Sequence, residues 1–127
     1  KKMKYILILI VCLLGGNIQA QTFIYGKSNF NDKIAKDIVV VEFWASWNSQ
    51  NEFKELVKLK ECNVYRVDIT DNMELQMEYD VLAIPTIIIF DNGIDKEYFH
   101  PNIMFQLEAD KKVIQNSIDT LLLNKFN

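Results

Sequence analysis

Residues 38–53 read IVVVEFWASWNSQNEF, and this stretch decides the fold of the chain. Its first part, Ile38 to Trp44, is almost entirely β-branched or aromatic, which is typical of a strand buried on both faces of a sheet. Asn48 or Ser49 can then act as the N-cap of a following helix. The apolar side chains of that helix would be those of Phe53, Leu56, Val57 and Leu59. We therefore expect a central strand that runs directly into a helix.

On either side of this stretch, the apolar periodicity alternates between strand and helix patterns. Val64 to Ile69 has the pattern of the next strand, and strand, helix and strand in succession predict a parallel, right-handed unit. Asn92-Gly93 is a strong signal for a hairpin between strands at 86–90 and 95–100. The other expected elements are a strand at 23–25, a helix capped by Ser28 with Phe30, Ile34 and Ile38 on one side, and helices at about 72–79 and 109–124. These elements predict a mixed sheet covered by helices on both faces.

Residues 1–20 have the pattern of a cleavable signal peptide. Lysines open the segment, an apolar run follows from Tyr5 to Leu14, and a small residue stands at Ala20, which predicts cleavage before Gln21. The alternative, a membrane anchor, would need about 18 apolar residues, and this run has only about ten. We therefore expect a periplasmic or secreted bacterial protein, with residues 21–127 as one domain and no stable membrane insertion.

Charge and cysteine content narrow the possible partners. The formal net charge is −3, and loss of the lysine-rich leader makes the remainder more acidic, which argues against binding nucleic acid or anionic membranes. Once Cys12 is removed with the leader, Cys62 is the only cysteine, so no internal disulfide can form. The hydrophobic core has to hold the domain together without a cross-link.

Two motifs resemble those of the thioredoxin family. Trp44, Ala45 and Trp47 match the family's F-W-A-x-W, and residues 48–51 occupy the positions of its Cys-Gly-Pro-Cys. Residues 79–93, YDVLAIPTIIIFDNG, resemble its Y-x-V-x-x-I-P-T-x-x-x-F-x-N-G, with Pro85 as the cis-proline. The resemblance spans nearly all of residues 21–127 and implies an α/β thioredoxin fold, a central mixed β-sheet flanked by helices on both faces.

The redox chemistry of that family does not transfer to this motif. Dithiol exchange needs a thiolate at the helix N-terminus and a second thiol that resolves the mixed disulfide. The motif positions here hold Asn48, Ser49, Gln50 and Asn51. Because an amide is neither a nucleophile nor an electron carrier, we expect no catalytic residue, no cofactor and no disulfide oxidoreductase activity.

The resemblance also implies a peptide-binding edge. In thioredoxin-like proteins, the backbone before the cis-proline pairs with an extended substrate segment, which here would be at Ile84, Pro85 and Thr86 with Trp47 beside it. Pro101 replaces a usual glycine, and about four extra residues follow before the last helix, so the groove wall at His100, Pro101 and Asn102 is altered. The alternative is that Trp47 and Pro85 only determine the fold.

The resemblance further places an acidic residue at Glu42 and a basic residue at Arg66 on the adjacent strand. With no cysteine to exchange protons with, the pair is expected to be a buried ion pair, and an acid/base role is the alternative. Cys62 is expected to be a small core residue, with a reactive thiol as the alternative. His100, the only histidine, lacks the neighbours of a metal site, so no metal is expected.

Three functions are open from the sequence. The first is a non-catalytic module that binds an extended peptide or protein partner, as a chaperone-like or assembly protein. The second is an enzyme related to thiol-disulfide oxidoreductases that acts through Cys62 or through an unrelated site. The third is a purely structural domain whose groove is vestigial.

Overall fold

The computed structural model describes residues 23–126, so the predicted signal peptide, its cleavage point and Cys12 lie outside the described residues. The sheet contains β1 (Ile38–Trp44), β2 (Asn63–Asp68), β3 (Thr86–Asp91) and β4 (Ile94–Phe99), in the order β2-β1-β3-β4. β1 pairs in parallel with β2 and antiparallel with β3, and β3 pairs antiparallel with β4. The predicted mixed sheet with β1 in its interior is confirmed.

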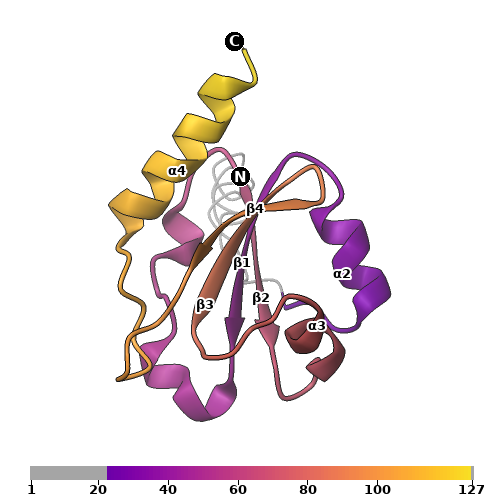
Figure 1. The fold of residues 1–127 in the computed structure, drawn as a ribbon, viewed down its shortest axis with the longest axis vertical. Coiled ribbons are helices and arrows are strands. Elements are labelled where there is room, and N and C mark those ends of the chain that lie inside the picture. The colour runs from indigo at the N-terminus through magenta and orange to yellow at the C-terminus, as the bar shows by residue number, and fades with distance from the viewer. Residues whose placement is uncertain (1–22, 127) are drawn as a thin grey trace, which may run out of the picture.

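Helices cover both faces of this sheet (Figure 1). One face packs under α2 (Lys27–Ile34) and α3 (Met73–Glu78), and the other packs under α4 (Lys111–Asn124). Every residue of β1 is buried, and its side chains alternate between two apolar clusters, as expected for a strand covered on both sides. Among residues 23–126, none of the helices has the length and apolar content required to span a bilayer.

The hairpin between β3 and β4 confirms the prediction from Asn92-Gly93. Asn92 has φ 49° and Gly93 has φ 84°, the left-handed conformations that a tight two-residue hairpin turn requires. The Asn92 side chain also accepts a hydrogen bond from the backbone N–H of Asp37 at 2.9 Å. The turn is therefore fastened to the segment that leads into β1.

The helix predicted after β1 is wrong. Among the described residues, two short 3₁₀ helices connect β1 to β2: η1 (Ser46–Asn51) and η2 (Leu56–Lys58). Asn48 lies inside η1 with non-helical angles (φ −115°, ψ 30°), and neither it nor Ser49 is the N-cap, a position held by Ala45.

A buried polar contact explains this difference. The Glu42 carboxylate accepts the backbone N–H of Phe53 at 2.7 Å, and the Arg66 guanidinium donates to the carbonyl oxygen of Phe53 at 3.0 Å. Both main-chain groups that a continuous helix would use at Phe53 are thus bound to the sheet, and Glu52 before it is extended (ψ 148°). A tertiary interaction overrides the local helical pattern.

Two smaller predictions near the N-terminus are also wrong. The strand expected at 23–25 is reduced to one bridge between Phe23 and Arg66. α2 begins at Lys27 after Gly26, with Ser28 inside the helix, because Gly26 (φ 84°) takes the N-cap position and donates its N–H to Asn72 at 2.7 Å.

Candidate functional site

The degenerate motif lies just beyond the carboxyl end of β1. In Figure 1, η1 and the loop that follows β4 both lie at the lower end of the view, past the tip of β1. The loop after β4, residues 101–107, contains the extra residues noted in the sequence and is called the insertion loop below. These two segments, far apart in sequence, contact each other directly through Trp47, Asn48 and Phe105.

The two positions that would hold redox cysteines are joined by an amide hydrogen bond. Asn51 Nδ2 donates to Asn48 Oδ1 at 2.9 Å, and Asn48 Nδ2 donates to the carbonyl oxygen of Phe105 at 3.2 Å. Asn48 is only 4% exposed, and both the oxygen and the nitrogen of its side-chain amide are hydrogen-bonded. The motif is therefore a chain of neutral hydrogen bonds that links η1 to the insertion loop.

Trp47 presents a large exposed aromatic surface at this end of β1. Its side chain is 63% exposed, whereas the other tryptophan, Trp44, is 9% exposed. The Trp47 ring meets the ring of Phe105 edge-on, with centroids 5.8 Å apart and an interplanar angle of 86°. This is the favourable T-shaped arrangement of two aromatic rings.

The insertion loop is closed by its own hydrogen bonds. Asn102 Oδ1 accepts the backbone N–H groups of Met104 at 2.8 Å and Gln106 at 3.1 Å, and Pro101 bridges to Leu107. Sequence reasoning included Asn102 but missed Phe105, which has φ 58° and is the residue that reaches the motif. The signal that could have found it is an apolar triplet, Ile103 to Phe105, in a segment with no strand or helix pattern.

The predicted groove residues are only partly brought together. The Ile84-Pro85 bond is cis, and Ile84 and Thr86 are 2% and 1% exposed, with the Thr86 hydroxyl donating to the Ala83 carbonyl oxygen at 2.7 Å. The backbone of Ile84 is therefore closed to solvent rather than presented as an open edge.

His100 and Pro101 line a different hollow. His100 is exposed and stacks on Tyr98, with ring centroids 6.0 Å apart. Both residues border a cavity of about 330 Å³ with Tyr98 and Glu108. Within the described part of the chain, no ring contact joins His100 to Trp47. The structure thus groups Asn102, through its loop, with the motif, but not His100.

The predicted ion pair is present at the centre of the sheet. Glu42 and Arg66 are register partners on β1 and β2, both are 0% exposed, and Oε1 lies 2.7 Å from Nε. Burial raises the pKa of Glu42, an effect opposed by the Arg66 charge and by the N–H of Phe53. A pair so enclosed organises the chain around Phe53 and offers no surface to a substrate.

Cys62 has the environment of an unreactive thiol. It is partly buried behind α4, and burial, with the nearby Glu61 carboxylate, raises the pKa of Cys62 to about 11. The side chain is therefore protonated at neutral pH, which makes it a poor nucleophile.

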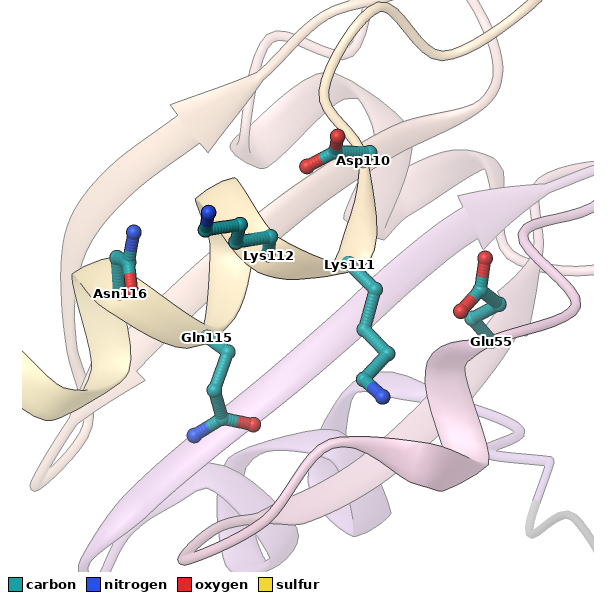
Figure 2. Close-up of a pocket in the computed structure, with 6 residues that line it drawn as sticks. All are labelled: Glu55, Asp110, Lys111, Lys112, Gln115 and Asn116. Atoms are coloured by element: carbon teal, nitrogen blue, oxygen red, sulfur yellow. The ribbon is translucent and has the colours of Figure 1, made fainter.

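Two hollows extend along the surface from the motif. One, of about 350 Å³, lies between the motif and the insertion loop and is lined by Gln50, Asn51, Glu52, Phe53, Lys54, Glu55, Gln106 and Leu107. The next, of about 450 Å³, shares Glu55 and is otherwise lined by the start of α4 (Figure 2). There, Asp110 is engaged as the helix cap, accepting from the N–H of Val113 at 3.0 Å. No set of three or more His, Cys, Asp or Glu side chains within residues 23–126 is placed to hold a metal ion.

Comparisons of both the sequence and the structure find similar proteins. The thioredoxin family model matches residues 21–119. A thioredoxin of Staphylococcus saprophyticus is 32% identical over 79 residues, which cover 54% of this chain and 75% of that protein. A thioredoxin of Mycoplasma genitalium is 29% identical over 69 residues, 50% of this chain and 68% of that protein. A mutant thioredoxin from Halobacterium salinarum gives a TM-score of 0.64 at 21% identity, over 80% of this chain and 94% of that chain, a likeness of fold alone.

Proposed function

The chain belongs to the thioredoxin family, and from that premise we propose that it is an exported, non-catalytic module that binds extended segments of other polypeptides. The observation that carries the proposal is the exposed Trp47 beside a motif filled with amides. Tryptophan is among the residues that contribute most to binding at protein interfaces, because it supplies a large apolar face at low entropic cost. Export rests on the signal-peptide pattern of residues 1–20.

The loss of thiols at the motif supports a non-catalytic role. Asn48 and Asn51 are bonded to each other, and neither can form a mixed disulfide or carry electrons. The remaining candidate, Cys62, has a pKa raised to about 11 and lies outside the motif. A redox activity like that of the thioredoxin relatives would need groups that these positions do not supply.

The segment before Pro85 supports a peptide as the ligand. Among the described residues, the backbone N–H and carbonyl of Ile84 make no hydrogen bond to another backbone group, so an added strand could pair with them once Ile84 is uncovered. Because Ile84 is only 2% exposed, a strand reaches it only when a neighbouring segment moves. Without a covalent intermediate, a short peptide should bind with micromolar or weaker affinity.

Calorimetric titration of the mature chain with a permanently unfolded polypeptide, reduced and carboxymethylated casein, tests the proposal. We expect Trp47→Ala to weaken binding by about tenfold or more, the effect of removing a central aromatic anchor. Leu123→Ala is the matched control, since Leu123 is 66% exposed on α4, away from the motif. Equal binding by Trp47→Ala and the unaltered chain would contradict the proposal, as would no binding at millimolar polypeptide.

A further inference from the structure

The insertion loop is seated on the motif as a peptide ligand would be. The main-chain carbonyl of Phe105 accepts a hydrogen bond from Asn48 Nδ2 at 3.2 Å, and its ring stands edge-on to Trp47 at 5.8 Å. A main-chain hydrogen bond combined with a side chain placed against an aromatic face is the pattern of peptide recognition. The surface that the proposed function assigns to a partner is thus already occupied by the chain itself.

The hydrogen bonds of the loop allow it to leave as a unit. Within the described part of the chain, the hydrogen bonds of residues 103–106 run to Asn102, apart from the single bond to Asn48. Ile103 and Met104 are 95% and 66% exposed, so they add little packing that would hold the loop down. Displacement of residues 103–106 would therefore cost one hydrogen bond and one ring contact to η1, while Leu107 stays packed against the core.

The backbone of Phe105 works against the seated position. Its φ of 58° lies in the left-handed region, which is unfavourable for a bulky L-residue. Where release also opens the loop's own hydrogen bonds to Asn102, Phe105 returns to an ordinary conformation, which offsets part of the lost contacts. This backbone cost lowers the free energy required to release Phe105 from Trp47 and Asn48.

We propose that the insertion loop is a built-in occupant of the Trp47–Asn48 surface, which takes polypeptide segments whose aromatic side chain replaces Phe105. The inference rests on the proposed function and deepens it, because it names both the ligand class and the contact that limits binding. The apparent affinity of such a site is reduced by the fraction of molecules in which the loop is released.

Two short glycine-serine peptides that differ only in a central phenylalanine or alanine test this inference by calorimetry. We expect the mature chain to prefer the phenylalanine peptide, and Phe105→Ala to bind that peptide about fivefold more tightly, because the occupant is removed. Ile103→Ala is the matched control in the same loop and should leave the affinity unchanged, since Ile103 is 95% exposed.

The outcomes separate this inference from the function on which it rests. If the unaltered chain binds the peptides but Phe105→Ala binds them equally or more weakly, the loop is not a competitor and the inference is overturned alone. If neither protein binds either peptide at millimolar concentration but casein is still bound, the inference is overturned and the proposed function stands; if casein is not bound either, the proposed function fails and takes the inference with it. Acrylamide quenching of Trp47 fluorescence without peptide is a second check: it should increase in Phe105→Ala and not in Ile103→Ala, and equal quenching in both would overturn the seated loop.

Discussion

One polar pair lies inside the sheet at β1, a second lies just past the end of β1, and the two pairs have different roles. Glu42 and Arg66 meet at 2.7 Å in the interior of the sheet, fully buried and charged, and together they hold the backbone of Phe53. Asn48 and Asn51 meet at 2.9 Å just past the end of β1, uncharged, and their second contact is to a surface loop. The first pair determines the path of the chain, and the second connects the motif to the insertion loop.

The difference shows which positions the fold constrains strongly and which it leaves free to change. A buried charge that loses its partner is costly, so the interior pair is constrained by stability. An amide pair at a strand end is neutral and satisfied by its neighbours, so it places little constraint on the fold. The experiments below test each half of this comparison, beginning with the largest expected effect.

Arg66→Ala should lower the free energy of unfolding by about 3–5 kcal/mol, because it leaves the Glu42 carboxylate buried without its cation. Urea denaturation followed by circular dichroism measures the change. Lys96→Ala is the control, since Lys96 is exposed on β4 and its loss should change stability by no more than about 0.5 kcal/mol. Similar midpoints for the two variants would remove the distinction between the interior pair and a surface charge.

The double variant Asn48→Cys, Asn51→Cys should form a disulfide, because the two side chains face each other, with Asn51 Nδ2 2.9 Å from Asn48 Oδ1. So short a loop predicts a stabilisation of about 2 kcal/mol over the reduced form. Thiol titration in a Cys62→Ser background measures closure, with each single variant as a control. A double variant that stays reduced under oxidant would show that the backbone of η1 has diverged from a redox motif.

The unaltered chain should not reduce insulin above the dithiothreitol background.

A smaller effect concerns the pH dependence of the interior pair. Burial raises the folded-state pKa of Glu42 above its ordinary value of 4.5, so the folded chain binds this proton more tightly than the unfolded chain does. The resulting stabilisation is complete below about pH 4.5 and is lost as the pH rises through the folded pKa.

We therefore expect the unfolding free energy of the unaltered chain, relative to Glu42→Gln, to fall as the pH rises above about 4.5 and then to level off. Urea denaturation of both proteins over a pH series measures this difference. A difference that grows with pH would mean that Arg66 outweighs burial and that the folded pKa lies below the ordinary value.

The sheet was predictable from the sequence because its signals are local. The β-branched run at 38–44 and the Asn92-Gly93 turn act through backbone preference and burial, and both appear as predicted. The segment from Asn48 to Leu59 was not predictable in this way, since its apolar spacing favours a helix. Its actual path depends on Glu42 and Arg66, which lie elsewhere in the sequence and bind the backbone of Phe53.

The candidate site was likewise predictable from the sequence only in part. The loss of the redox thiols and the position of Trp47 follow from the motif and need no coordinates. The role of Phe105 does not, because the insertion loop has no periodic pattern and its contact with Asn48 spans 57 residues of sequence. Sequence reasoning therefore assigned the groove wall to His100, Pro101 and Asn102 and missed the residue of the same loop that meets Trp47.

The most direct test of the account is to map where an unfolded polypeptide binds, using amide shifts of the isotope-labelled mature chain titrated with carboxymethylated casein. The account predicts that the perturbed amides cluster at Trp47, Asn48, Ile84 and the insertion loop, while those of the buried Glu42 and Arg66 stay unchanged. Perturbations confined to another surface, or none at millimolar polypeptide, would contradict the claim that this family member has exchanged redox chemistry for binding at the end of β1.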